Sequence, residues 1–287
     1  MPNIEEKDIK KLLFGLIAIT TIIKIFIAST LDLSVDEVYY WTYALYPDWS
    51  HFDHPPMVGW IIQLFSLNLF FDNELALRFG AIVISVMNTL VIYSIGKSLP
   101  TAHSGIKNAL TGLYAAMLFN ASIYASVLAG NFIIPDTPQL LFWLLSLKFL
   151  LKSLPEREIK NVAVKHFLVA CLFTGLAIIS KYHGVFIWAG IGLYVLLYNR
   201  NWLKTPYFYL GGIISALFIL PIVIWNIKNN WISFNFHSER VSNELVIRMD
   251  YLLTELFGQI AYNNPINYVL IVIALFTTYK GRLSIKS

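Results

Sequence analysis

The sequence has few charged residues and only one cysteine. Asp, Glu, Lys and Arg make up 13% of its 287 residues, whereas a soluble globular domain carries about 25%. Cys171 has no partner for an intrachain disulfide, so a disulfide framework is excluded. The sequence also lacks a glycine-rich phosphate loop after a strand, a metalloprotease helix motif and a Pro/Gly/Ser linker. These absences argue against a soluble nucleotide-binding enzyme and favour a single membrane domain over residues 1–287.

Hydrophobic residues make up 57% of the chain and gather in runs of membrane-spanning length. A transmembrane helix needs about 20 mainly apolar residues. Six runs come close to this length: residues 12–30, 77–96, 109–128, 138–152, 207–225 and 263–279. A further stretch, residues 166–198, is interrupted by the polar segment 180–184, so it is either one broken helix or two short spans.

Loop charge helps to decide between these two alternatives, because Lys and Arg gather in cytoplasmic loops. With two spans, most basic residues fall on one side of the membrane and most acidic residues on the other. The sequence therefore predicts an all-α polytopic membrane protein with about eight transmembrane helices and both termini inside. The net charge of +4 is spread over short inner loops and gives no reason to expect a nucleic-acid partner.

Two predicted outer segments, residues 31–76 and 226–262, are longer than a connection requires, so we expect function there. Apolar and aromatic residues recur at helical spacing over residues 35–46. Pro55 and Pro56 are typical of the start of a second helix, whose apolar face begins at Met57. We expect two interfacial helices that hold the first outer segment at the lipid headgroups.

Four acidic residues in the predicted outer region are candidates for chemistry. Asp36 and Glu37 are adjacent, and two neighbouring carboxylates are more than a helix cap requires. Asp53, which precedes His54, and Asp136 are candidates for binding roles, but each is also placed to cap the helix that follows it.

The candidate cations also have simpler interpretations. Lys181 lies at the outer break between two spans, where it either binds a ligand or extends toward water. Arg78 follows Glu74 by four residues and is expected to pair with it. Arg240 follows an aromatic stretch and is a further candidate for binding. Lys24 lies inside the first span and is interpreted as a tolerated or snorkelling lysine.

Five motifs occur in a fixed order on the predicted outer side: VDEVYYW, FDHPPMVGW, PDTPQLLFW, SKYHG and WNIKNNWISFNF. This order resembles the membrane module of bacterial polyprenyl-phosphate-dependent glycosyltransferases of the GT-C type. These enzymes are related to protein O-mannosyltransferases and lipid A aminoarabinose transferases. The resemblance covers most of residues 12–262.

The resemblance implies an inverting transfer of a sugar from a polyprenyl-phosphate donor to an acceptor hydroxyl. The reaction would take place at the outer face of a bacterial inner membrane. In the resemblance, Asp36, with Glu37 beside it, corresponds to the acid taken as general base. A carboxylate within reach of the acceptor hydroxyl can accept its proton. Lys181 matches a basic residue expected near the donor phosphate.

The remaining carried-over residues have less definite roles. Asp53 and Asp136 are expected to orient the site or to hold a divalent metal ion through oxygen ligands. His54 occupies a position where relatives reading EKPP have lysine, which puts its role in phosphate binding in doubt. Relatives usually continue into further spans and an outer domain, which this chain is expected to lack.

Two other functional classes compete with the enzyme interpretation. A transporter or lipid flippase would carry ionisable residues at mid-membrane or paired broken helices in two related halves. A noncatalytic subunit of a glycosylation complex would keep the fold and lose the base.

Overall fold

We describe a computed structural model over residues 5–99, 106–242 and 249–284. Its regular structure in these ranges is entirely helical, as expected, and contains no strand. The helices of the first half are α1 (Glu6–Thr30), α2 (Val35–Leu45), α3 (Met57–Phe65), α4 (Glu74–Ser98), α5 (Ile106–Ala121), the π-helix η1 (Ile123–Leu128), α6 (Ala129–Asn131) and α7 (Asp136–Ser153). Those of the second half are α8 (Asn161–Ser180), η2 (Tyr182–Val185), α9 (Phe186–Tyr198), η3 (Arg200–Lys204), α10 (Pro206–Leu217), α11 (Leu220–Lys228), α12 (Ile232–Ser242), α13 (Met249–Tyr262) and α14 (Pro265–Ser284).

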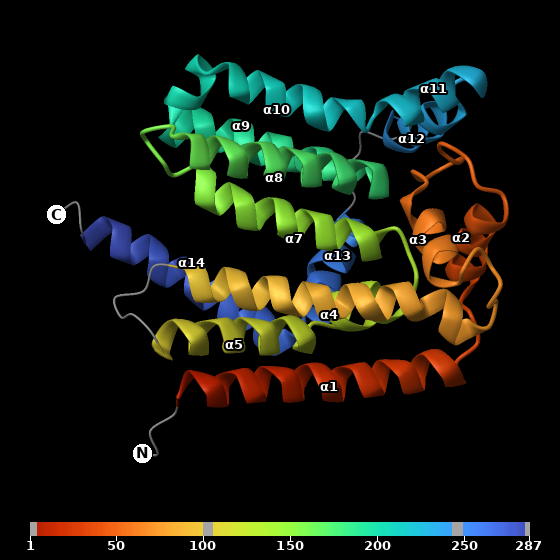
Figure 1. Ribbon diagram of the computed structural model, residues 1–287, viewed down its shortest axis with the longest axis horizontal. Helices are drawn as coiled ribbons and strands as arrows, with labels where there is room; N and C mark the ends of the chain where they lie inside the picture. The colour runs from red at the N-terminus through yellow and green to blue at the C-terminus, as the bar shows by residue number, and fades with distance from the viewer. Residues whose placement is uncertain (1–4, 100–105, 243–248, 285–287) are drawn as a thin grey trace.

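The long helices run side by side in a bundle, and the short helices α2, α3, α11 and α12 gather at one end of it (Figure 1). Neighbouring helices approach closely where one of them has glycine. A Cβ added to Gly175 of α8 would lie 2.3 Å from the Phe218 ring, which follows α10. Phe167 and Trp202 are fully buried in the largest apolar cluster, which joins α7, α8 and α9.

The structure supports three to six membrane spans by length and composition. Helices α1, α4 and α8 qualify alone, and three bent pairs qualify if each pair is one span: α5 with η1–α6, α10 with α11, and α13 with α14. The expected count of about eight is higher because it includes α7 and α9. Helix α7 carries Asp136, Lys148 and Lys152 within its 18 residues, and α9 has only 13 residues.

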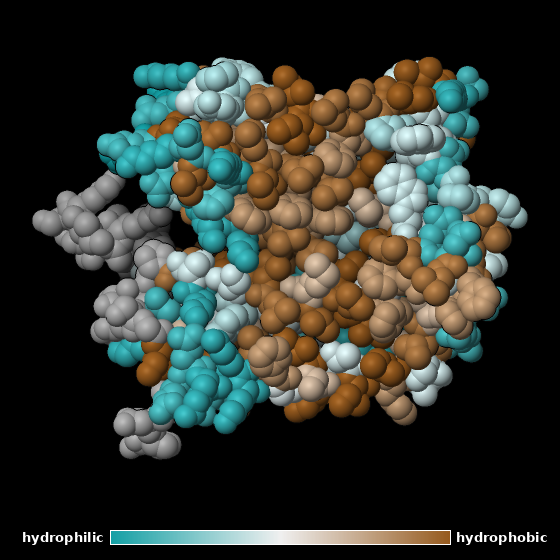
Figure 2. All heavy atoms as spheres, in the orientation of Figure 1, coloured by the Kyte–Doolittle hydropathy of each residue, from teal (hydrophilic) through white to brown (hydrophobic). Residues whose placement is uncertain are grey.

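The surface of the bundle has the polarity of a membrane protein. Figure 2 shows a wide hydrophobic band across the middle of one face, with hydrophilic residues concentrated at the end where α1 begins. Many large apolar side chains are exposed on the helices of this band, for example Ile22 at 66%. Such a surface is stable in lipid and would be a liability in water. The protein is therefore an integral membrane protein.

Lys24 is an exception within the first span. Its side chain is 6% exposed, and its Nζ donates a hydrogen bond to Ser85 Oγ on α4. The interpretation of Lys24 as a snorkelling lysine is wrong, because its amine points into the bundle toward α4 and not toward the headgroups.

The two helices expected in the first outer segment are confirmed. Ser34 caps α2 by accepting a hydrogen bond from the Glu37 N–H, and Glu37 in turn accepts one from the Ser34 N–H. This is a capping box. Pro56 immediately precedes α3, and the two helices share an apolar cluster with the start of α4. In the second outer segment, the described residues 226–242 and 249–262 are mostly helical.

Candidate active site

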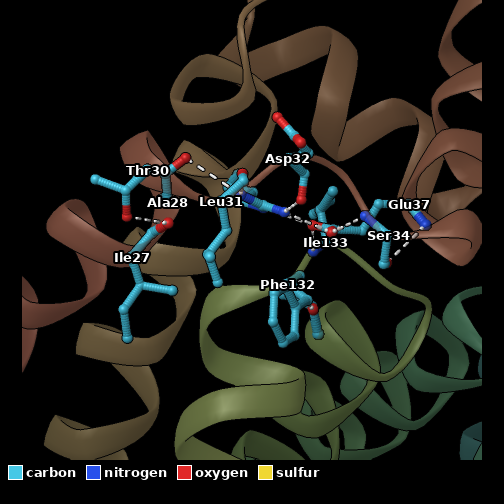
Figure 3. A network of polar contacts seen from close by, with 11 residues as sticks. Ile27, Ala28, Thr30, Leu31, Asp32, Ser34, Glu37, Phe132 and Ile133 are labelled. Carbon is cyan, nitrogen blue, oxygen red and sulfur yellow. Dashed lines mark hydrogen bonds and ion pairs between the residues drawn. The ribbon is translucent and has the colours of Figure 1, made fainter.

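A buried ion pair between Glu37 and Arg78 joins α2 to α4 at the end of the bundle that carries the short helices α2 and α3 (Figure 1). Both side chains are fully buried, and Arg78 donates from Nε and Nη2 to the two Glu37 oxygens, each at 2.8 Å. Arg78 also donates to the backbone carbonyls of Ala28 in the last turn of α1 and of Leu31 and Asp32, which follow α1. The Ile133 N–H completes the network by donating to Glu37 Oε1 at 3.2 Å (Figure 3).

This network corrects two expectations. Arg78 pairs with Glu37, 41 residues away, and not with Glu74. Glu37 has both oxygens engaged by donors and has no surface open to a substrate, so its geometry does not fit the expected catalytic role. Burial alone raises the pKa of Glu37, but its contacts with Arg78 and with the Ser34 and Ile133 N–H groups outweigh burial and lower the pKa.

Asp36 has the opposite environment. It lies in the first turn of α2 with its side chain exposed, although its neighbour Glu37 faces the interior. Within the described ranges, no hydrogen bond or ion pair engages the Asp36 carboxylate. The Asp36 carboxylate is therefore open to accept a proton.

Asp53 lies at the centre of an aromatic hydrogen-bond cluster and does not cap α3. Its Oδ1 accepts from the hydroxyls of Tyr39 at 2.9 Å and Tyr43 at 2.6 Å, and its Oδ2 lies 3.2 Å from His54 Nδ1. Burial raises the pKa of Asp53, but the interactions with His54, Tyr43 and Tyr39 outweigh it and hold the pKa below its usual range. His51 stacks on the Tyr43 ring with the centroids 3.6 Å apart.

Asp136 at the start of α7 and Lys181 at the end of α8 form an ion pair. Lys181 Nζ lies 2.8 Å from both oxygens of Asp136, and Tyr124 donates a hydrogen bond to Oδ1 from its hydroxyl. The pair is mostly buried, with the Lys181 side chain 23% exposed and the Asp136 side chain 14% exposed. Asp136 therefore binds Lys181 and does not cap α7 with its side chain.

The ion pair lines a cavity of about 310 Å³, here called the polar cavity. Its walls are Tyr124, Asp136, Gln139, Leu140, Trp143, Lys181 and His183. Asp36 and Asp53 are not among the residues that line it. The polar cavity thus combines a cation, a carboxylate and a phenol.

Tyr40 links the polar cavity electrostatically to the acids of α2 and the following loop. Burial raises the pKa of the Tyr40 phenol above its usual range, and the negative charges of Asp53, Asp36 and Asp136 raise it further. All three carboxylates therefore act on one buried phenol. The hydrogen bond from the Ile133 N–H to Glu37 connects the segment before Asp136 to helix α2, which carries Asp36.

The second outer segment closes over the first. His237 of α12 lies 2.9 Å from the Asp53 carbonyl oxygen through Nε2, and Ser233 Oγ donates to the His51 carbonyl. Trp225 Nε1 donates to Asp48 at 2.7 Å. The two long outer segments therefore meet at the predicted site. The side chain of Arg240 lies outside the described residues, so its binding role stays a prediction.

Sequence reasoning missed several residues that the structure brings to the site. His183 follows Lys181 by two residues and lines the polar cavity. The pKa of His183 is lowered mainly by burial and further by the positive charge of Lys181. Tyr124 and His237 are also new. The spacing of Ser34 and Glu37 was a usable signal, because Ser-x-x-Glu before an apolar run is the capping-box pattern.

The two residues expected to hold a divalent metal ion, Asp53 and Asp136, are both engaged by other side chains. Among the described residues, no group of three or more His, Cys, Asp or Glu side chains is close enough to bind one ion. Both oxygens of Asp136 contact Lys181, and both oxygens of Asp53 contact Tyr or His side chains. A divalent cation would have to displace these partners, so the arrangement does not fit a metal.

Comparison with known proteins identifies the family. The family model described as dolichyl-phosphate-mannose-protein mannosyltransferase matches residues 53–225, which include Asp53, Asp136 and Lys181. Neither the curated proteins nor the solved structures include a match to the chain. The family match covers more than half of the sequence and runs through the polar cavity. The chain therefore belongs to the dolichyl-phosphate-mannose-protein mannosyltransferase family, whose members are GT-C glycosyltransferases that use a lipid-phosphate-linked sugar.

Proposed function

We propose that the protein transfers a sugar, with inversion, from a polyprenyl phosphate to an acceptor hydroxyl at the outer face of the membrane. The observation that carries this proposal is the ion pair of Asp136 and Lys181 in the wall of the polar cavity, at the same end of the bundle as helix α2 with Asp36 (Figure 1). Carboxylates and a cation are thus held together at the end of an apolar bundle. This end bears the interfacial helices α2 and α3 (Figure 1).

Asp36 acts as the general base in this proposal. As the acceptor oxygen attacks the anomeric carbon, its proton passes to the Asp36 carboxylate. The bond from the anomeric carbon to the phosphate oxygen breaks, and its electron pair leaves with the phosphate. One displacement of this kind inverts the anomeric configuration. Glu37 is a positioning residue, because its ion pair with Arg78 holds the first turn of α2 in place.

Lys181 stabilises the charge that shifts onto the departing phosphate. Its ammonium has three hydrogens, and Asp136 already engages it through both oxygens. The donor phosphate would share or replace Asp136 at Nζ, with His183 at the same cavity wall. Asp53 orients the site through Tyr39 and Tyr43, while His54 holds the Asp53 carboxylate.

Two apolar cavities that flank Phe186 of α9, here called the α9 cavities, are suited to the prenyl tail. One is about 280 Å³ and runs between α7 and α9, and it shares Trp143 with the polar cavity. The other is about 450 Å³ and shares His183 with it. A lipid phosphate bound at Lys181 would thus have apolar walls beside it for its tail.

The proposed topology has eight passes, with α7 and α9 as short spans inside the bundle. Helices α7, α8 and α9 lie parallel in Figure 1, which favours this count. An eight-pass topology puts both termini on the cytoplasmic side of a bacterial inner membrane and the site on the periplasmic side. Cysteines introduced at Asn229 and Lys160 should then react with an impermeant thiol reagent from opposite sides. Labelling of both from one side would reject the topology.

The test of function uses purified protein, a panel of radiolabelled polyprenyl-phosphate sugars and a membrane extract as acceptor source. We expect free lipid phosphate to appear with one donor and the product to have the opposite anomeric configuration. Asp36→Asn should slow this transfer by about 10²- to 10⁴-fold, the usual contribution of a general base. Transfer by Asp36→Asn at the wild-type rate would remove Asp36 from the mechanism.

A further inference from the structure

The buried amine of Lys24 lies where α1, α4 and α6 meet. Its Nζ donates a hydrogen bond to Ser85 Oγ of α4. Gly130 of α6 is close to both groups, because a Cβ added there would lie 2.9 Å from Ser85 Oγ and 3.4 Å from Lys24 Nζ. Within the described ranges, no carboxylate forms an ion pair with Lys24. A charged amine in this place therefore has no counter-charge from those side chains.

Two buried asparagines are neighbours of the groups around this amine. Asn131 follows Gly130 directly in α6, and it is 1% exposed. Asn88 is fully buried and comes three residues after Ser85 in α4, a spacing that makes two side chains neighbours on the helix surface. Neither the nitrogen nor the oxygen of either amide has a hydrogen-bond partner among the described residues. Since buried polar atoms normally have partners, these amides point to a ligand.

Hydrogen-bond donors outnumber acceptors in this group, which we call the Lys24 site and which consists of Lys24, Ser85, Asn88 and Asn131. Two of the three ammonium hydrogens remain after the bond to Ser85. Each asparagine amide adds two N–H groups but only one oxygen. The balance is the same whichever way an amide is turned, because both of its atoms lack a partner. A positive charge with surplus donors favours an anion over a cation or a neutral molecule.

We propose that the Lys24 site binds a small monovalent anion, such as chloride, inside the bundle. One negative charge neutralises the ammonium, whereas a divalent anion such as sulfate would leave a buried charge in excess. None of the four residues lines the polar cavity, so the Lys24 site is distinct from the proposed site of sugar transfer.

The Lys24 site adjoins the Arg78 network that Figure 3 shows. Arg78 donates to the carbonyl of Ala28, which lies one helical turn after Lys24. The Arg78 guanidinium also lies 5.3 Å from the ring centre of Phe132, the residue after Asn131. A bound anion would thus hold α1, α4 and α6 together where they support the segment that leads into α7.

Chloride binding is measured with radiolabelled chloride on the purified full chain in detergent. We expect saturable binding of one chloride per protein. Lys24→Met should abolish this binding, because it removes the charge and keeps an unbranched side chain. Lys148→Met is the matched control and should bind chloride like the wild type, since Lys148 lies in α7 and outside the Lys24 site. Asn131→Ala should weaken chloride binding about tenfold, as expected for one hydrogen bond to a charged group.

Unfolding tests whether the anion belongs to the folded protein. Replacing gluconate by chloride at constant ionic strength, up to about ten times the measured Kd, should lower the unfolding equilibrium constant of the wild type about tenfold. The same exchange should leave the unfolding of Lys24→Met unchanged, and its melting transition shows that this variant folds. Absence of saturable chloride binding to the wild type would overturn the inference. Chloride binding left unchanged by Lys24→Met or by Asn131→Ala would also overturn it.

Discussion

Replacing Glu37 by Gln should lower the stability of the folded protein, whereas replacing its neighbour Asp36 by Asn should slow sugar transfer and leave the stability almost unchanged. Both changes swap a carboxylate for an amide of the same shape, so the two variants are matched. Glu37 is fully buried and carries four donor contacts on its two oxygens, two from Arg78 and one each from the Ser34 and Ile133 N–H groups. Asp36 is exposed.

The magnitude follows from these contacts. The glutamine amide presents an NH₂ group where one carboxylate oxygen had accepted two donors, so two hydrogen bonds are lost and donors face each other. Arg78 also loses its counter-charge while it remains buried. Removing one partner of a buried ion pair costs about 3–5 kcal/mol, which is a large part of the about 5–15 kcal/mol that stabilises a typical domain. An exposed change such as Asp36→Asn costs about 0.5 kcal/mol or less.

The assay is denaturant or thermal unfolding in a single detergent, run beside sugar transfer on the same preparations. Adding Arg78→Met to Glu37→Gln should cost less than the sum of the two single changes, because removing both partners leaves no unpaired charge. A Glu37→Gln protein that unfolds like the wild type but has lost transfer would refute the structural assignment and return Glu37 to the chemistry.

Three other predictions follow from the site. Gly184→Ala should lower the free energy of unfolding by about 1–3 kcal/mol and slow transfer, because the added Cβ would lie 2.5 Å from the Ala177 backbone and push Lys181 and His183 away from the cavity. Gly192→Ala is the control, because an added Cβ there meets nothing within 4 Å. Equal stability of the two variants would contradict this prediction. Burial lowers the pKa of His51 to about 4. Between about pH 6.5 and 4, His51 is therefore protonated in the unfolded chain and neutral in the folded protein. Stability should therefore fall between about pH 6.5 and 4, by at most about 1.4 kcal/mol per pH unit from this residue, and His51→Gln should flatten that part of the unfolding profile; an unchanged slope would remove His51 as the cause. Chelation with EDTA should leave the transfer rate unchanged, because Asp53 and Asp136 are already bound by Tyr, His and Lys side chains, and loss of activity restored by Mg²⁺ would show that a metal displaces them.

The helices were predictable from the sequence to the extent that hydrophobic length and local signals define them. The apolar runs and the two short helices of the first outer segment were predicted, because Pro56 and the aromatic residues of α2 act locally. The pairing of Arg78 was not predictable in the same way. Glu74 is four residues away and Glu37 is 41, and only the packing of α2 against α4 makes the distant partner the nearer one.

The candidate site shows the same division. Asp36, Asp53, Asp136 and Lys181 stand out because charges are rare in an apolar chain, and the structure brings them to one end of the bundle. Their individual partners depend on tertiary contacts, such as those from Tyr43 to Asp53 and from Tyr124 to Asp136. His183 lies in the motif SKYHG, but the motif alone did not indicate that its side chain lines the cavity with Lys181.

The buried amine of Lys24 has a consequence for how the protein is assembled during synthesis. A lysine near the centre of an isolated helix adds about 2.5–3.5 kcal/mol to the cost of insertion into the bilayer. The first helix meets that cost when it leaves the translocon, but Ser85, its hydrogen-bond partner, is made 61 residues later. The first helix should therefore remain at the translocon or at its lipid boundary until the fourth helix emerges, and the two should enter the lipid as a pair.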